Sequence, residues 1–357
     1  MINSATLRDV GLAQGEQISM EQSQLSERAQ KLHFETLVCD VLLPWEDVYI
    51  PAGADFSRLL NRFKTAGVDY VSITVTSIST THDAFLKVAA MRRRILALSD
   101  SCVLVETTDD ILRAKAAGKL AVGMHFQGTN PFEMNIDVIE PFYKLGIRHA
   151  LMVYNLKNFV GDGCHEDTNC GLSRFGKLVI REMNRVGMIV DVTHTGYRSS
   201  MEAMELSSAP TIFSHSNARA LYDHDRNIRD DQIKACADTG GVVCLNGVGM
   251  FLGPEETPET IVSSVIRHID YMVELVGPEH VGLGMDFMYL EGSDYGFYYK
   301  YKFAFPKGYP DPPWHFFRPE QMPELTEELL RRGYQEADIR GILGENFFRV
   351  ASEVWIP

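Results

Sequence analysis

Two histidines follow neighbouring β-strand-like runs, and imidazole is a common ligand of protein-bound metal ions. The apolar runs 188–192 and 210–213 lead into His194 and His215, and the segment 197–207 between them has a helical composition. In a parallel sheet the C-terminal ends of neighbouring strands lie at the same edge, so the two side chains can meet at one point. Either histidine alone is typical of a hydrogen-bonded residue near a sheet edge. The pair at matching positions predicts a metal site.

A carboxylate at another strand end would extend this site. Asp286 in the stretch GLGMDF supplies it, so that two nitrogens and one oxygen could hold a zinc-type ion and leave a position for water. Such an ion lowers the pKa of its water, and a neighbouring carboxylate can take the proton, which makes Asp286 a candidate catalytic base as well as a ligand. The alternative is a buried, hydrogen-bonded aspartate. The further candidate ligands are Gln127, His125 and Asp40.

Three other side chains are candidates for binding the substrate. Arg226 and Asn227 follow the sixth strand-like run in the stretch HDRN, and Tyr154 ends the fourth. An arginine at this edge is suited to holding a carboxylate through two parallel hydrogen bonds, although a surface salt bridge is the alternative. The Tyr154 hydroxyl could donate a hydrogen bond to the oxyanion that forms when a carbonyl is attacked, which gives it a catalytic role as well.

The elements that must position these groups alternate along the chain. The expected strands are 36–43, 70–75, 120–126, 149–153, 188–192, 211–213, 241–245 and 281–285, and helical segments lie between them. Eight strands alternating with helices predict an α/β fold of the (β/α)8 TIM-barrel type, in which catalytic groups come from the C-terminal ends of the strands. A doubly wound open sheet is the alternative, but no glycine-rich nucleotide-binding motif follows the first run.

Segments outside this alternation extend the barrel. Residues 1–33 are expected to form an N-terminal extension with a helix over 19–33, and residues 318–357 a C-terminal helical cap. The aromatic, proline-rich residues 292–317 are expected to form an ordered loop over the barrel mouth, or else a docking surface for a second subunit. Because no linker or internal repeat divides the 357 residues, we expect a single domain over 1–357.

Composition excludes some partners. The formal net charge is −14, which argues against nucleic acid or an anionic membrane, since either needs a basic surface. The chain shows neither a secretory signal nor a run of 18 apolar residues. The six cysteines include no CxxC pair and are expected to be thiols, and we expect a cytoplasmic protein.

Several longer stretches resemble the renal (membrane) dipeptidases, which are metal-dependent (β/α)8 hydrolases related to the amidohydrolases. The resemblance spans about residues 36–355 and rests on GLSRFGKLVIREMNRVGMIVDVTH, APTIFSHSNARAL, DHDRNIRDDQIKA, EHVGLGMDF and ADIRGILGENFFRV. It implies that His194 and His215 are zinc ligands and that Arg226 contacts the substrate carboxylate. It also implies that Asp286 is both a ligand and the catalytic acid/base, and it favours a homodimer.

The chain departs from the family at the other half of a two-metal site. The first strand of the family ends in His-x-Asp before Leu-Pro, whereas CDVLLPW places Asp40 and Leu42 at those positions. The family's bridging Glu aligns with Gln127 and its strand-4 His with Tyr154. A neutral amide is a poor bridge between two dications because it brings no charge to offset theirs. We therefore expect one divalent ion, zinc first, at His194 and His215, with Asp286 and a further ligand from Gln127, His125 or Asp40.

These observations predict a metal-dependent hydrolase that cleaves a dipeptide or a small amide bearing a carboxylate. The missing metal ligands leave two alternatives open. One is a non-catalytic pseudo-hydrolase that binds a ligand or serves in assembly, and the other is a barrel enzyme with lyase or isomerase chemistry.

Overall fold

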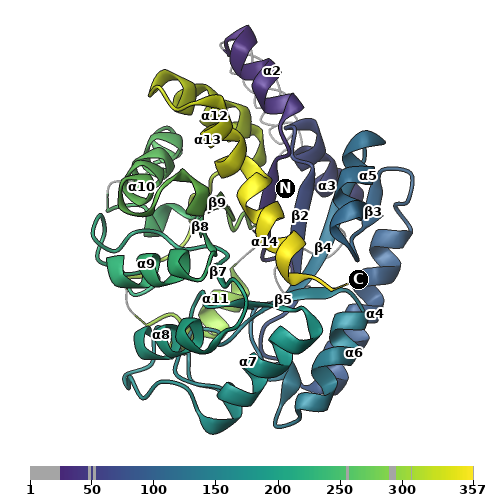
Figure 1. Cartoon of the computed structure of the whole chain (residues 1–357), viewed down its shortest axis with the longest axis vertical. Helices are drawn as coiled ribbons and strands as arrows, with labels where there is room; N and C mark the ends of the chain where they lie inside the picture. The colour runs from purple at the N-terminus through teal and green to yellow at the C-terminus, as the bar shows by residue number, and fades with distance from the viewer. Residues whose placement is uncertain are drawn as a thin grey trace, which may run out of the picture.

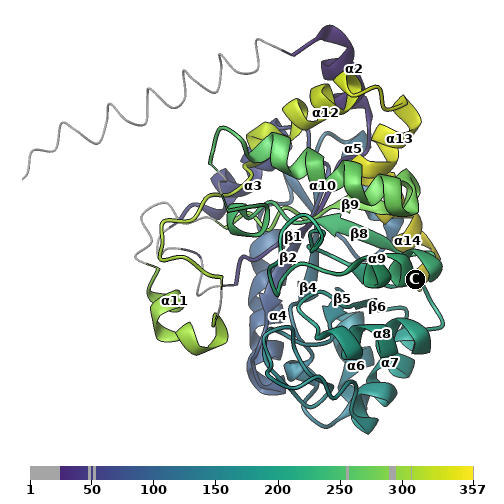
Figure 2. The same cartoon turned by 90° about the vertical axis from the view of Figure 1, so that its left-hand side faces the viewer.

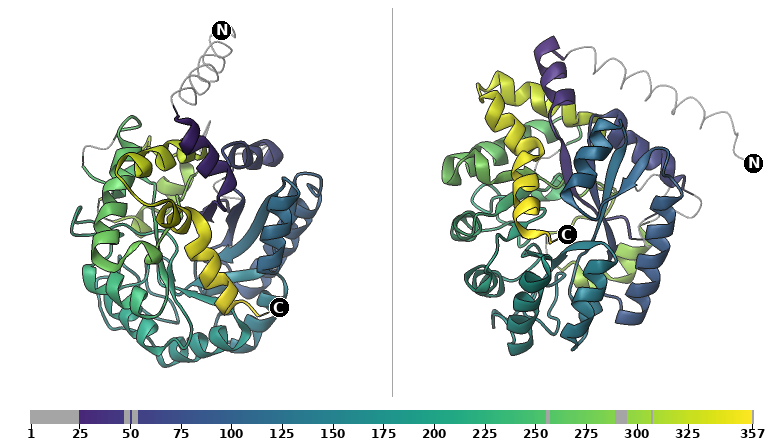
Figure 3. Two further views of the ribbon diagram at one scale, coloured as in Figure 1. Left: turned by 45° about the horizontal axis from the view of Figure 1, so that its top comes forward. Right: turned by 45° about the vertical axis from the view of Figure 1, so that its right-hand side comes forward.

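The core of the protein is a parallel β-barrel. The computed structural model describes residues 25–46, 50, 54–254, 257–288, 295–306 and 308–356. Eight strands follow one another around the sheet: β1 (Cys39–Leu43), β2 (Tyr70–Thr76), β4 (Leu120–Phe126), β5 (Ile147–Leu151), β6 (Ile189–Asp191), β7 (Ile212–Phe213), β8 (Val242–Leu245) and β9 (Val281–Leu283). Helices surround them (Figures 1 and 3). The predicted (β/α)8 barrel is confirmed.

The seam between the first and last strands is closed through a buried carboxyl group. Oδ1 of Asp40 accepts hydrogen bonds from the backbone nitrogen of Met285 at 2.9 Å and from that of Leu42 at 3.3 Å. The backbone nitrogen of Asp286 donates to the oxygen of Leu42 at 3.2 Å. Asp40 therefore connects β1 to the segment that follows β9, at the C-terminal end of the barrel.

The outer helices begin at the residues that their sequences indicate. The side chains of Asp55, Thr80 and Ser173 each accept a backbone N–H from the first turn of α3, α4 and α7, which satisfies a donor that the helix leaves unpaired. The outer helices are α3 (Phe56–Thr65), α4 (Thr81–Leu96), α5 (Thr108–Ala116), α6 (Ile139–Lys144), α7 (Arg174–Val186), α8 (Tyr197–Leu206), α9 (Asp230–Asp238) and α10 (Ile261–Val276).

The structure differs from the expectation in two short elements. A further strand, β3 (Cys102–Leu104), pairs with the first half of β4, whereas β5 pairs with its second half. β3 has only three residues, and only one of them is buried. No hydrophobic pattern in the sequence therefore predicts this strand. Between β4 and β5, where one helical segment was expected, a 3-10 turn (Ile136–Val138) precedes α6. Of the N-terminal extension, α2 (Glu27–Glu35) is described, and the expected helix start at 19 lies outside the described residues.

The C-terminal helices α12 (Met322–Arg331), α13 (Glu336–Arg340) and α14 (Asn346–Val354) close the other end of the barrel. Phe347 of α14 stacks on Tyr70 at the start of β2, with ring centroids 5.7 Å apart. Figure 2 shows α14 on one side of the barrel and α11 (Gly296–Lys300) on the opposite side. The strand ends that carry the candidate site therefore face away from the helical cap.

Among the described residues, no helix is long and apolar enough to cross a membrane.

We predict that Gly344→Ala destabilises the fold by about 1–3 kcal/mol, because added methyl groups strain a packed core. A Cβ atom on Gly344 would lie 2.3 Å from the Leu37 oxygen and 2.8 Å from the Cys39 nitrogen, where the helical cap meets β1. Urea unfolding followed by circular dichroism measures the change. Gly253→Ala is the control, since its Cβ would meet only the end of the long Arg267 side chain, at 3.3 Å. Equal stability of the two variants would contradict this packing.

Candidate active site

The two predicted histidines meet at the C-terminal end of the barrel. The Nε2 atoms of His194 and His215 are 2.9 Å apart. Both side chains are buried, and burial together with the charge of Arg226 holds their pKa values well below the usual range. They are therefore neutral at physiological pH, which is the form of imidazole that binds metal ions.

Each imidazole is oriented through its other nitrogen. Nδ1 of His194 lies 2.6 Å from the Oδ1 atom of Asn155, and Nδ1 of His215 lies 2.8 Å from the hydroxyl of Ser214. An amide oxygen only accepts hydrogen bonds, so the His194 proton is on Nδ1 and its Nε2 carries a lone pair. Metal-binding histidines are commonly held in this way by a second residue.

The predicted carboxylate lines the same cavity as His194. Oδ2 of Asp286 accepts a hydrogen bond from Asn246 at 3.0 Å. Burial raises the pKa of Asp286 to about 7, and burial likewise raises the pKa of Asp40 to about 7. The charge of Asp286 adds to the effect on Asp40, whose Oδ2 atom has no hydrogen-bond partner.

Arg226 carries a buried charge beside the histidines. Its side chain lies over the Phe251 ring at 5.3 Å, and a guanidinium nitrogen donates to the His215 carbonyl at 3.4 Å. Among the described residues, no carboxylate oxygen lies within 4.0 Å of its guanidinium nitrogens. A buried charge without a partner is costly, so this position favours an anionic ligand.

The other predicted residues have different surroundings. Gln127 and Tyr154 line the cavity, and the Tyr154 ring stacks on His194 at 4.6 Å. His125 instead lies inside the barrel, where its two ring nitrogens contact the hydroxyls of Ser72 and Thr74, both at 2.8 Å. Asn227 donates its amide hydrogens to the carbonyls of Tyr222 and Phe251, both at 2.9 Å, while its Oδ1 has no partner. Gln127 and Tyr154 therefore lie at the same cavity as His194. The side-chain nitrogens of His125 and Asn227, in contrast, are hydrogen-bonded to other groups.

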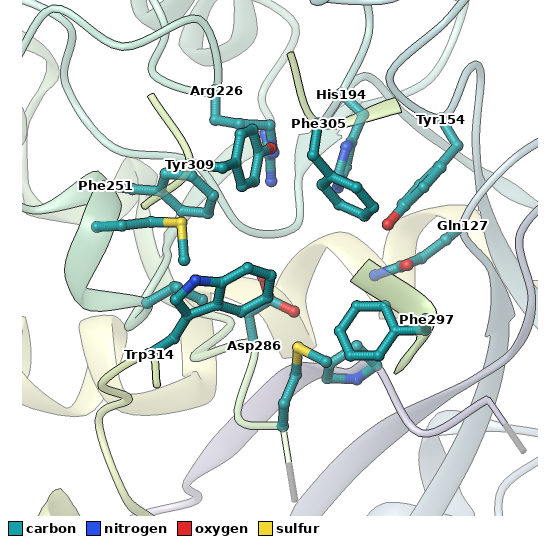
Figure 4. A pocket seen from close by; sticks show the side chains of 14 residues that line it. Gln127, Tyr154, His194, Arg226, Phe251, Asp286, Phe297, Phe305, Tyr309 and Trp314 are labelled. Carbon is teal, nitrogen blue, oxygen red and sulfur yellow. The ribbon is translucent and has the colours of Figure 1, made fainter. Parts of the chain in front are cut away.

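Aromatic side chains from residues 295–306 and 308–317, which we call the aromatic segment, cover the cavity. Those that line it are Phe297, Phe305, Tyr309 and Trp314. In Figure 4, Arg226 and Tyr309 lie on one side of the cavity, Tyr154 and Gln127 on the other, and His194 between them. The cavity is small, with about 50 Å³ of space open to water-sized groups.

Contacts with the loops above the strands hold this segment. The Tyr309 hydroxyl lies 3.0 Å from Nε2 of His165, and the Ala304 carbonyl accepts a hydrogen bond from Asn155 at 2.9 Å. Gly308 has a φ of 77°, and a Cβ there would lie 2.4 Å from Nε2 of His224, so this approach requires glycine. The sequence indicated a loop over the mouth, but it did not reveal these partners.

The donor set fits part of a divalent-ion site. Two imidazole nitrogens converge, but within the described part of the chain no three His, Cys, Asp or Glu side chains come together in a way that could hold an ion. Asp286 shares the cavity with His194 without completing such a group. Gln127 also lines this cavity, and its side-chain oxygen is a candidate further ligand.

Comparison with known proteins agrees with these features. The model of the membrane dipeptidase family (peptidase family M19) matches residues 48–355. The chain belongs to this family, as the sequence motifs predicted. An uncharacterised dipeptidase of Schizosaccharomyces pombe is 30% identical over 281 residues, covering 77% of this chain and 63% of the relative. Dipeptidase aclJ of Aspergillus oryzae is 29% identical over 276 residues, covering 76% and 61%. The chain thus spans less than two thirds of these relatives.

Solved structures share the fold over their whole length. An amidohydrolase from Pseudomonas aeruginosa is 28% identical with a TM-score of 0.81, and the match covers 92% of this chain and 99% of that one. A metallopeptidase from Rhodobacter sphaeroides, solved with a phosphinate mimic of the dipeptide L-Ala-D-Ala, is 22% identical with a TM-score of 0.71, covering 90% and 100%. That second likeness shows the fold alone. A divalent metal is the cofactor that membership of a metallopeptidase family implies.

We predict that Asn155→Gly weakens zinc binding by roughly 10–100-fold, because it removes the acceptor that orients His194. Glycine tolerates the backbone at this position, where φ is 57°, so the loss reports on the side chain. Competition with a fluorescent chelator measures the affinity. Asn155→Asp keeps an oxygen acceptor and is expected to restore most of it. Unchanged affinity in the glycine variant would show that the contact does not matter.

Proposed function

We propose that this chain is a metal-dependent hydrolase that cleaves a dipeptide, or a small amide bearing a carboxylate. The observation that supports it most directly is the buried guanidinium of Arg226, without an ion pair among the described residues and beside two converging imidazoles. A substrate carboxylate would neutralise this charge through two parallel hydrogen bonds. The rest of the substrate would then extend along the cavity past His194.

The residues of the cavity would have different roles in hydrolysis. His194 and His215 would hold a divalent ion, with oxygen from Asp286 or Gln127, and the ion would supply an activated water and polarise the carbonyl. Asp286, held by Asn246, would take the proton of the attacking water and pass it to the leaving nitrogen. Tyr154 would donate a hydrogen bond to the oxyanion. The aromatic segment would exclude bulk water, which strengthens each of these interactions.

We propose one ion per chain rather than two. Leu42 is buried and apolar where the family has an aspartate, and Gln127 stands where it has a bridging glutamate. Zinc fits the two imidazoles best, because it accepts nitrogen ligands and four-coordinate geometry. With one ion, more of the charge that develops on the oxyanion would have to be stabilised by Tyr154.

A non-catalytic protein that binds a carboxylate ligand is the second candidate. The observation that favours it is the absence, among the described residues, of a third His, Cys, Asp or Glu side chain at the histidine pair. In that case the neutral imidazoles and Arg226 would form a recognition site without an activated water. Assays of turnover and of binding with the same compounds separate the two candidates.

Arg226→Met tests the carboxylate contact. We expect kcat/KM for a free dipeptide to fall roughly 10–100-fold, since a hydrogen bond to a charged group contributes about 1.5–3 kcal/mol. The same dipeptide with an amidated C-terminus should be a poor substrate for the wild type and change little in the variant. Arg229→Met is the control, because Arg229 lies three residues further on, over the Tyr197 ring. An equal loss with both substrates would refute the assigned contact.

Metal analysis tests the ion. Protein purified after growth with zinc is expected to carry about one equivalent of divalent metal per chain, and His215→Ala to carry none. Dialysis against a chelator should abolish dipeptide hydrolysis, and zinc or manganese should restore it. Two tightly bound equivalents, or full activity without metal, would refute the single-ion site.

A further inference from the structure

A second cavity lies behind three of the rings that bound the active-site cavity. Tyr154, Phe297 and Phe305 line both spaces, so they form a shared wall. By the same measure as the first, the second cavity offers about 580 Å³. The rest of its lining combines apolar side chains, among them Ala304 and Phe303 of the aromatic segment, with polar ones such as Ser77, Asn130 and Asn158.

The first cavity alone is too small for the proposed substrate. At roughly 10–15 Å³ for each water-sized group, its space of about 50 Å³ holds only a few such groups. Even a dipeptide without side chains is larger. Part of any substrate must therefore lie beyond the first cavity, and the shared wall is the boundary with the larger space.

The direction of the substrate follows from Arg226. In a dipeptide the free carboxylate belongs to the leaving amino acid, so its contact with Arg226 fixes that half at one side of the cavity. The acyl half, which carries the amino-terminal side chain, then passes His194 towards Tyr154, on the side opposite Arg226 (Figure 4). Tyr154 belongs to the shared wall, and the second cavity lies on that side.

The lining of the second cavity indicates a neutral, aromatic occupant. Its cations are already paired: Nζ of Lys87 lies 2.7 Å from Glu46, and Nζ of Lys157 lies 3.1 Å from Asp162. A charged side chain would find no free counter-charge among these groups. Phenyl rings, in contrast, offer edge-to-face contacts to another ring. Phe303 at this cavity is 69% exposed, so its ring is available for such a contact.

We propose that the second cavity is the subsite for the amino-terminal side chain of the substrate, and that it selects large aromatic side chains. This inference rests on the proposed function, because it uses the carboxylate contact of Arg226 to orient the substrate. Phe305, between the two cavities, is the specificity-determining residue, and its ring must turn aside to join them. Ala304 lines the second cavity but not the first, which makes it the position at which the subsite can be filled.

The test compares Ala-Gly with Trp-Gly in the metal-loaded wild type and in Ala304→Phe. We expect kcat/KM of the wild type to be roughly 10–100-fold higher for Trp-Gly, from burial of the large side chain. Ala304→Phe should remove this preference, so that the two dipeptides have similar kcat/KM values in the variant. Lys300→Phe adds the same ring to an exposed position of the aromatic segment and should behave as the wild type.

Thermal shifts with the same two dipeptides give a readout that does not need turnover. If neither compound is hydrolysed but Trp-Gly stabilises the wild type more than Ala304→Phe, the hydrolase proposal fails and the subsite stands. If both are hydrolysed with equal kcat/KM, the subsite is overturned and the hydrolase stands. Equal thermal shifts in the absence of hydrolysis overturn the subsite as well.

Discussion

The amide of Asn155 is the contact on which the site depends, because it connects three parts of the molecule. Its oxygen orients His194, its nitrogen donates to the Ala304 carbonyl, and its backbone belongs to the loop after β5. Asn155, His194 and Asp286 have φ angles of 57°, 61° and 56°, which is unusual for residues other than glycine. Each follows a barrel strand, and the closed barrel around them balances a strain of about 1–3 kcal/mol per residue. The backbone thereby places His194 and Asp286 at the cavity and Asn155 against His194.

The electrostatics of the cavity follow from how little water reaches it. Burial makes both histidines neutral and raises the pKa of Asp286 to about 7, while Arg226 keeps its charge without an ion pair among the described residues. The guanidinium therefore contributes a buried positive charge to the site before any ion binds. An anionic substrate would neutralise this positive charge, and a bound dication would add to it. Carboxylate binding and metal binding should consequently reinforce each other, since the carboxylate offsets the charge that the ion adds.

The parts of this molecule that follow periodic rules could be predicted from sequence. Apolar runs gave the eight barrel strands, and the parallel topology brought His194 and His215 to one edge. The role of Asn155 could not be predicted, because it depends on a left-handed backbone and on a carbonyl 149 residues further along. His125 shows the opposite case, in which the position along the strand was evident but the contacts of the ring were not. Its position near a strand end suggested a ligand, but its ring points into a layer of hydroxyls that only the barrel register reveals.

The departures from the family motif also have a structural consequence. With Asp40 in place of a histidine, one carboxyl oxygen holds the seam between β1 and Met285, and the other is buried without a partner. A histidine at position 40 has no oxygen that could accept these two backbone hydrogen bonds. Restoring the family's ligand would therefore remove the contact between β1 and Met285. Leu42 packs in the barrel with no exposed surface, and Gln127 brings no charge. Binding of a second ion would thus require substitutions at all three positions together. Any one of these substitutions alone would leave a buried polar group or an unbalanced charge. The packing of Asp40 and Leu42 in the barrel therefore supports the proposal of a single ion.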